Sequence, residues 1–158
     1  MSRNIHDLRE WFAVKVLAFQ FKCVKDGHEI RIVRTLTTDL TQGALHAIGR
    51  RPLTIEESAD LRKEGLYPDN LDKVRTNART AMDTPHGLGL AFDCILLKDG
   101  IPWDNPPDEA WQNVYRIAEQ CGLDPMGDKK FGEYMSFDKG HFSEMGWKLY
   151  KRDGIIDI

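Results

Sequence analysis

Two short segments that each pair a histidine with an aspartate constrain this chain more than any other feature. The first, Thr84 to Asp93, contains His86, and the second runs from Asp138 to His141. Three nitrogen and oxygen ligands with a fourth position open to water are typical of a catalytic zinc site, which also uses a separate carboxylate to move protons. The pattern therefore predicts that His86, Asp93 and His141 hold zinc and that Asp138 is the proton shuttle.

The chain must turn sharply between His86 and Asp93 if both side chains are to contact one ion. A separation of seven residues corresponds to about 23 Å along a strand and about 10 Å along a helix axis. Gly87 and Gly89 permit positive φ and thus a reversal directly after His86. Residues 91–97 then form a predicted strand that carries Asp93, with His86 on the loop before it. The alternative interpretation is that both pairs are ordinary turn residues beside glycines.

Three motifs, in order along the chain, resemble one family of zinc peptidases. Residues 84–93 resemble the S-x-H-x-x-G-x-A-x-D signature of zinc D,D-carboxypeptidases, D,D-dipeptidases and L-alanyl-D-glutamate peptidases, and residues 137–142 resemble the second signature of that family. Residues 30–35 and 42–50 are similar to a run in its peptidoglycan-cutting branch. The resemblance extends from residue 5 to residue 147 and is closest to phage endolysins that cut L-Ala–D-Glu bonds.

This resemblance implies both a fold and a set of roles. The fold is a compact α+β domain with a small antiparallel sheet and flanking helices, the cofactor is zinc, and the substrate is bacterial peptidoglycan. Arg34 would share the developing oxyanion with zinc. Thr84, Gln42 and Arg50 are candidates for holding the peptide and its carboxylates, although a structural role for Gln42 and Arg50 is equally compatible with the motif.

Several positions depart from the family pattern without removing a predicted ligand or Asp138. Thr84 replaces serine and keeps a hydroxyl, His46 replaces tyrosine, and Gly140 replaces a common proline, which loosens the backbone before a ligand. Ser143 stands where the family often has glutamate, with Glu144 one position later. We therefore expect altered substrate preference rather than altered chemistry, with Glu144 as the second choice for the proton acceptor.

Length and composition indicate one ordinary globular domain. The 158 residues, 41% hydrophobic and 30% charged, are enough to bury a core. We expect one peptidase domain over residues 1–158, a monomer, with a helical insertion at 51–73 and no separate wall-binding domain. A formal net charge of −3 with interleaved basic and acidic residues argues against nucleic acid as a partner.

The cysteines and the N-terminal region bear on where the protein is made. Cys23, Cys94 and Cys121 are odd in number and irregularly spaced, which predicts buried free thiols and synthesis in a reducing compartment. The apolar run at 11–19 is too short for a membrane span and is a poor secretory signal. We expect a phage lysis protein made in the host cytoplasm that reaches the wall once another factor opens the membrane, without stable membrane insertion of its own.

Hydrophobic periodicity and capping residues predict the secondary structure. Asn4 caps a helix at 5–25 that is apolar on most faces and so buried, a membrane-active amphipathic helix being the alternative. A strand is predicted at 29–35, and helices at 39–48, at 54–64 after a Thr54 to Glu57 capping box, and at 109–121. The family resemblance makes Met135–Asp138 an edge strand that carries the shuttle and His141.

Three other functions compete with the endopeptidase hypothesis. The same fold could act as a D-Ala-D-Ala carboxypeptidase or dipeptidase, which the block at 42–50 disfavours. A non-catalytic zinc-containing binding module is disfavoured by the presence of Asp138 and Arg34. A metal nuclease with histidine and aspartate ligands is disfavoured by the weak basic character of the chain.

Overall fold

The computed structural model describes residues 2–64, 76, 78–125, 128–130, 133–135 and 139–152. The helices are η1 (Ile5–Asp7), α1 (Glu10–Lys25), α2 (Asp39–Ala47), α3 (Ile55–Lys63), η3 (Ala81–Asp83), α4 (Asp108–Gln120) and α5 (Trp147–Arg152). The strands are β1 (Glu29–Arg34), β2 (Ala91–Lys98), β3 (Ile101–Pro102), β4 (Leu123–Pro125), β5 (Asp128–Lys130), β6 (Glu133–Met135) and β7 (His141–Glu144).

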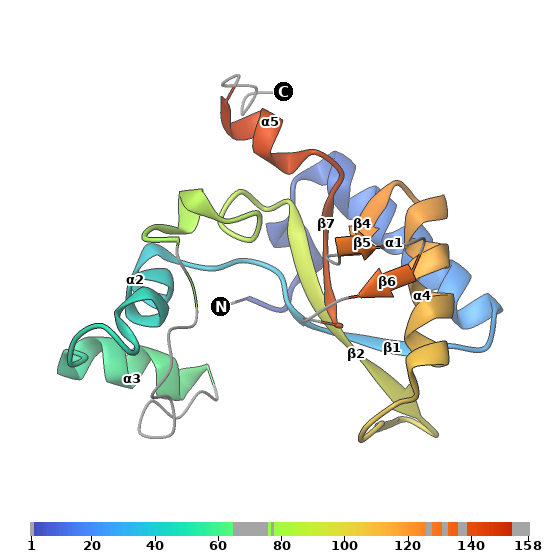
Figure 1. Cartoon of the computed structure of the whole chain (residues 1–158), viewed down its shortest axis with the longest axis horizontal. Helices are drawn as coiled ribbons and strands as arrows, with labels where there is room; N and C mark the ends of the chain where they lie inside the picture. The colour runs from blue at the N-terminus through green and yellow to red at the C-terminus, as the bar shows by residue number, and fades with distance from the viewer. Residues whose placement is uncertain are drawn as a thin grey trace.

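The main sheet is antiparallel throughout, with strand order β1-β2-β7-β4 and with β3 paired to β2. Helices α1 and α4 lie beside this sheet, whereas α2 and α3 form a separate group on the opposite side of the molecule (Figure 1). This arrangement confirms the predicted α+β fold with a small antiparallel sheet and flanking helices.

The main core lies between the sheet and the two helices α1 and α4. Phe142 of β7 contacts Phe19 of α1 and Phe92 of β2, with ring centroids 5.1 and 5.3 Å apart, and all three side chains are fully buried. Successive side chains on a strand point to opposite faces. Asp93 and His141, the sequence neighbours of Phe92 and Phe142, therefore point away from this core and toward the other face of the sheet.

The predicted helix at 5–25 is divided in two, and only one of its faces is buried. Asn4 caps η1 by accepting a hydrogen bond from the backbone of His6, and the extended Leu8 separates η1 from α1. The break occurs where Arg9 N–H donates to the carbonyl of Gly89 (3.0 Å), which ties the chain to the loop before β2. The prediction that the apolar helix is buried therefore holds for one face only, since Phe19 is fully buried whereas Phe21 is 71% exposed.

The predicted edge strand at Met135–Asp138 is described only at its first residue, so it stays a prediction. Met135 ends β6, which pairs with β5 in a separate two-stranded ribbon, and residues 136–138 lie outside the described residues. His141 instead begins β7, which lies between β2 and β4 inside the main sheet. Backbone pairing on both sides of β7 therefore sets the position of His141.

Helices α2 and α3 form a second, smaller core. Ala44, Ile48 and Leu61 are buried together, and Thr41 Oγ1 donates to Asp60 Oδ2 across the two helices (2.7 Å). The predicted capping box at the start of α3 is confirmed, because Thr54 and Glu57 bond each other's backbone N–H groups. The proposal that residues 51–73 form an insertion stays a prediction, and residues 65–73 lie outside the described part of the chain.

The ion pair between Arg51 and Glu57 should make the stability of the α2–α3 pair depend on pH. Its hydrogen bonds, 2.6 and 2.9 Å long, hold the pKa of Glu57 down to about 2. Because this pKa is lower in the folded than in the unfolded protein, ionised Glu57 stabilises the fold at pH values above the unfolded pKa of about 4.3. This stabilisation is lost as the pH falls from about 4.3 toward 2. Glu57→Gln keeps the capping box and should lower the free energy of unfolding at pH 7 by about 1 kcal/mol.

Chemical denaturation at pH 7 and at pH 3 measures this difference. The difference in the free energy of unfolding between wild type and Glu57→Gln should be present at pH 7 and smaller at pH 3. Glu56→Gln, which changes an exposed glutamate of the same helical turn, serves as the control and should show no such difference. Equal differences at both pH values would contradict the assignment to the Arg51–Glu57 pair.

The cysteines are free, as predicted, although they differ in burial. Cys23 and Cys94 are buried and Cys121 is partly exposed. Burial raises the pKa of the Cys23 thiol to about 12 and that of Cys94 well above its usual value, so both stay protonated and unreactive near neutral pH. Over the described residues, none of the helices has the length and apolar character needed to cross a membrane.

Candidate metal centre

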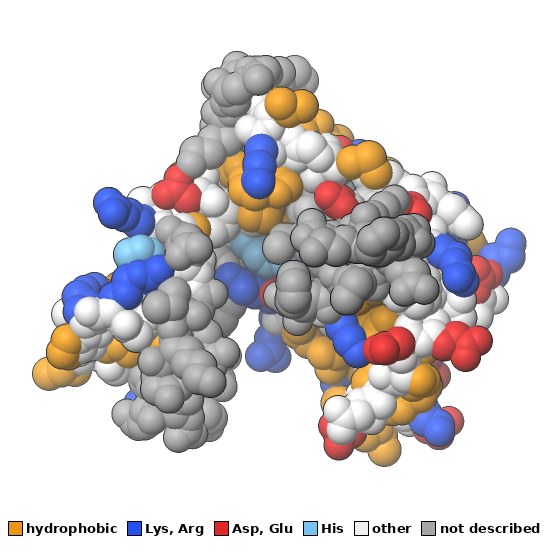
Figure 2. Space-filling view, in the orientation of Figure 1, with side chains coloured by type: hydrophobic (Ala, Val, Ile, Leu, Met, Phe, Trp, Pro, Cys, Tyr) orange, Lys and Arg blue, Asp and Glu red, His pale blue; other side chains and the backbone are white. Residues whose placement is uncertain are grey.

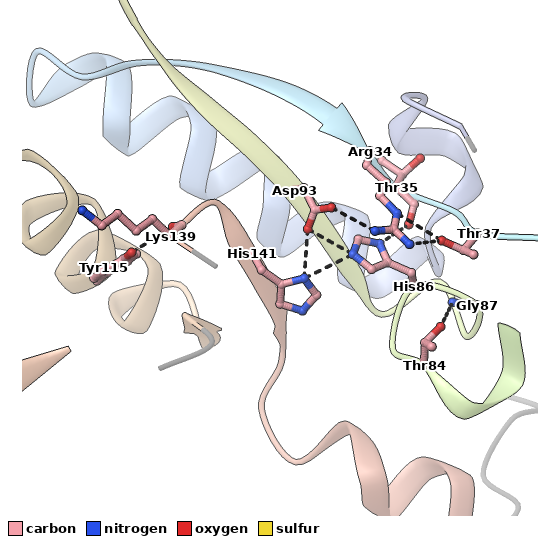
Figure 3. Close-up of polar contacts among 10 residues, drawn as sticks. All are labelled: Arg34, Thr35, Thr37, Thr84, His86, Gly87, Asp93, Tyr115, Lys139 and His141. Carbon is pink, nitrogen blue, oxygen red and sulfur yellow. Dashed lines mark hydrogen bonds and ion pairs between the residues drawn. The ribbon is translucent and has the colours of Figure 1, made fainter. Parts of the chain in front are cut away.

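Strand β2, the loop before it and the distant strand β7 bring His86, Asp93 and His141 together. Asp93 lies on β2, His141 is the first residue of β7 and pairs directly with Asp93 in the antiparallel register, and His86 lies on the loop before β2. The three side chains point toward one another (Figure 3). This is the strand-and-loop placement that the sequence predicted for His86 and Asp93.

One atom from each side chain faces the same point. His86 Nε2 lies 3.1 Å from Asp93 Oδ1 and 3.2 Å from His141 Nδ1, and His141 Nδ1 lies 2.9 Å from Asp93 Oδ1. Within the described residues, these three form the one group of histidine, cysteine and acidic side chains spaced to hold a metal ion. Two imidazole nitrogens and one carboxylate oxygen are donors that suit zinc.

A backbone carbonyl decides which nitrogen of His86 can bind a metal. His86 Nδ1 lies 2.8 Å from the carbonyl oxygen of Thr35, and a carbonyl can only accept, so Nδ1 carries the proton. In neutral His86 the lone pair is therefore on Nε2, where it faces the carboxylate of Asp93. Two lone-pair atoms at this distance repel each other unless a cation or a proton lies between them. The arrangement thus fits a metal ion, with the hydrogen bond to Thr35 orienting the imidazole as metal sites require.

Burial and hydrogen bonding set the charges of the centre. Burial lowers the pKa of His86 despite the opposing attraction of Asp93, which disfavours a proton on Nε2. Burial alone would raise the pKa of Asp93, but the ring nitrogens of His141 and His86 that face its carboxylate outweigh burial and hold the pKa of Asp93 well below its usual range. A neutral histidine beside an ionised aspartate is the state in which both can bind a cation.

Glycines allow the backbone to approach closely on both sides of the centre. A Cβ on Gly87 would overlap the backbone carbonyl of Ala81, and Gly89 has a φ of +70°. The predicted reversal after His86 therefore uses positive φ at Gly89 and the missing side chain at Gly87. A Cβ on Gly140 would overlap the carbonyl of Cys94 in β2, so glycine here permits close packing of the strands.

Arg34 lies at the end of β1 opposite Asp93, as expected for a residue that reaches the site. Its Nη1 is 3.5 Å from Asp93 Oδ2, whereas its Nε and Nη2 donate to Thr37 Oγ1 at 3.1 and 2.6 Å. The two carboxylate oxygens of Asp93 thus have different partners: Oδ1 faces the histidines and Oδ2 faces Arg34. In the space-filling view, histidine side chains reach the surface near the middle of this face, with Lys or Arg side chains beside them (Figure 2).

The three predicted substrate-binding residues make hydrogen bonds to the protein itself. Thr84 Oγ1 donates to the carbonyl of Ala81 and accepts from Gly87 N–H, so it shapes the loop that carries His86. Gln42 donates to the carbonyl of Ala78 at 3.0 Å. Arg50 donates to the carbonyls of His46 and Thr76. These contacts favour the structural alternative for Gln42 and Arg50, and their binding of substrate stays a prediction.

Of the two candidates for the proton acceptor, Asp138 is untested by the structure and Glu144 lies away from the centre. Asp138 lies outside the described residues, so its role stays a prediction. Glu144 is buried on β7, where its carboxylate accepts two hydrogen bonds from Lys15 Nζ at 2.8 Å. Because it is three positions from His141 on a strand, it points to the opposite face of the sheet. The second choice for the proton acceptor is therefore not part of this centre.

Sequence reasoning missed three features that complete the centre. The carbonyl of Thr35 orients His86, and the hydroxyl of Thr37 holds Arg34. Among the described residues, none is a hydrogen-bond partner of the buried His141 Nε2 or Ser143 Oγ. If Nδ1 of His141 binds a metal, Nε2 carries the proton, and no described residue supplies the acceptor that usually accompanies such a ligand. Only the Arg34-Thr35 pair gave any signal in the sequence, as part of a motif.

Comparisons of the structure identify known proteins with this fold. A mutant of the vancomycin-resistance D,D-pentapeptidase VanY, solved in complex with Zn(II), superposes with a TM-score of 0.56 at 16% identity over 93% of this chain and 79% of that chain. VanYB in complex with D-alanine-D-alanine gives 0.52 at 15% identity, covering 93% and 78%. The LdcB LD-carboxypeptidase, described for its recognition of peptidoglycan, gives 0.51 at 14% identity over 93% of this chain.

These likenesses show a shared fold. The chain spans 64% of the length of the LdcB chain. Neither the protein-family models nor the curated protein sequences gave a match. The chain therefore shares its fold with VanY and LdcB, and three of its side chains could hold a metal ion.

Proposed function

We propose that this protein is a zinc-dependent peptidoglycan endopeptidase that cleaves the L-Ala–D-Glu bond of the stem peptide. The observation that carries the proposal is the convergence of His86 Nε2, Asp93 Oδ1 and His141 Nδ1, with the proton of His86 held on its other nitrogen by Thr35. Three protein ligands leave a fourth position for water, the pattern of a catalytic rather than a structural zinc site.

Each residue then has a defined task. Bound zinc would lower the pKa of a water molecule from about 15.7 toward about 7, so that hydroxide is available at neutral pH. Asp138 accepts the proton as the water attacks and delivers it to the leaving amine. Arg34 has five N–H groups and uses three of them on Thr37 and Asp93. The remaining two have no partner among the described residues and would stabilise the oxyanion that forms on the peptide carbonyl.

The choice of bond rests on the motif block at 42–50, which is similar to that of the L-alanyl-D-glutamate peptidases. We further propose that the protein is a phage endolysin, made in the host cytoplasm as a monomer and acting on the wall after the membrane is opened. The free thiols Cys23, Cys94 and Cys121 are compatible with synthesis in a reducing compartment.

A carboxypeptidase acting on terminal D-Ala is the second candidate, because LdcB is an LD-carboxypeptidase and VanYB was solved with D-alanine-D-alanine. Digestion of purified peptidoglycan, followed by analysis of the new chain ends, separates the candidates. New D-Glu amino termini are expected, lost after treatment with a chelator and restored by zinc. Release of D-Ala alone would establish the carboxypeptidase instead, and new reducing sugar ends would exclude both peptidases.

A further inference from the structure

The hydroxyl of Thr37 accepts two hydrogen bonds from one edge of the Arg34 guanidinium. Thr37 Oγ1 accepts from Arg34 Nη2 at 2.6 Å and from Nε at 3.1 Å, so both of its lone pairs are used. Thr37 is only 2% exposed, so water cannot replace it as the acceptor without a rearrangement. The side chain of Arg34 is 23% exposed and would otherwise be free to turn toward solvent.

This contact determines which edge of the guanidinium faces Asp93. With Thr37 bound along the Nε–Nη2 edge, the guanidinium is turned so that Nη1 faces the carboxylate, 3.5 Å from Oδ2. Oδ1 is left to face both histidines. Because Oδ2 faces Arg34, it does not join the three donor atoms that could bind a metal. The positive charge of Arg34 also stabilises the ionised form of Asp93.

We infer that Thr37 is a positioning residue that, through Arg34, restricts Asp93 to presenting one oxygen to the metal. This inference rests on the proposed zinc site and extends it. If the guanidinium were free to rotate, Oδ2 could also turn toward the ion, since carboxylates bind metals through one oxygen or through two. A second carboxylate oxygen would add a fifth ligand beside the water and crowd the place where the peptide carbonyl must approach, so the metal would stay bound while hydrolysis slows.

Substitution of cobalt for zinc makes this coordination visible. Co(II) absorbs visible light more strongly with four ligands than with five or six, so the spectrum reports on the number of ligands without depending on activity. Thr37→Val keeps the shape of the side chain and removes the acceptor, and Thr37→Ser keeps the acceptor. Thr41→Val is the matched control, because Thr41 is equally buried but its hydroxyl bonds Asp60 in the α2–α3 pair.

We expect Thr37→Val to weaken the visible bands of the Co(II) protein and to lower kcat on the stem peptide about 10- to 100-fold with little change in KM, the usual weight of an outer-shell contact. Thr37→Ser and Thr41→Val should keep the wild-type spectrum. Arg34→Lys, which retains the charge but loses the fork of donors, should repeat the spectral change even if Thr37→Val does not fold.

An unchanged Co(II) spectrum in both Thr37→Val and Arg34→Lys would overturn the inference, as would an equal change in Thr41→Val. A wild-type protein that binds neither Co(II) nor zinc would overturn it together with the metal site. If the wild type binds the metal but cleaves no stem peptide, the proposed function fails alone, and the spectra still decide the role of Thr37.

Discussion

Replacing His86, Asp93 or His141 by Ala is expected to remove zinc and reduce peptidoglycan hydrolysis to the background level. Each replacement leaves only two of the three donor atoms that converge in the fold, whereas zinc sites with an open position use three protein ligands. Elemental analysis of the purified variants should find one zinc per wild-type chain and almost none in each variant. Since metal binding adds to folding stability in small domains, the variants should also melt at lower temperature when zinc is supplied.

His6→Ala is the matched control for these three variants. His6 is an exposed histidine of η1 that is not part of the group of donor atoms. It should retain full zinc and wild-type hydrolysis. Full zinc content in His86→Ala, Asp93→Ala and His141→Ala would refute the ligand assignment, even if hydrolysis were lost in all three.

Asp138→Asn is expected to keep zinc while slowing hydrolysis by roughly 10² to 10⁴, the usual contribution of general acid–base catalysis. The amide has almost the same size and polarity as the carboxylic acid but cannot accept a proton from water. The measurement combines zinc content with the rate of release of D-Glu amino termini. Because the loss affects the chemical step, kcat should fall much more than KM rises.

Asp99→Asn controls for the exchange of a carboxylate for an amide. Asp99 lies in the turn between β2 and β3 at a φ of 54°, a conformation that asparagine tolerates well, and its replacement should change neither zinc content nor rate. Near-normal turnover in Asp138→Asn with bound zinc would exclude Asp138 as the proton acceptor. Glu144 could not then be assumed to replace it, because its carboxylate is bound to Lys15 on the other face of the sheet.

The residues of the centre could be predicted from the sequence because they occur in short motifs whose geometry depends on neighbouring residues. His86 and Asp93 are linked by a local turn that needs glycine at positions 87 and 89, and both glycines are visible in the sequence. The capping box of α3 is equally local, as it links the side chain of Thr54 to a backbone group three residues away. Features that depend on near neighbours in the chain could therefore be predicted.

Features that depend on contacts between distant segments could not be predicted from the sequence. The apolar sequence of α1 predicted a buried helix, but only the packing of one face against Phe92 and Phe142 decides that Phe21 is exposed. Likewise, nothing local distinguishes an edge strand from the interior position that β7 takes between β2 and β4.

The sequence by itself determined which side chains are available to the centre and where the main helices and strands lie, because these depend on residue type and local periodicity. Only the tertiary structure decided how those side chains are held. The register between β2 and β7 pairs His141 with Asp93. The carbonyl of Thr35, 51 residues from His86, selects the nitrogen of His86 that faces Asp93. A hydrogen bond between segments this far apart leaves no trace in local sequence, since any residue type supplies the same carbonyl.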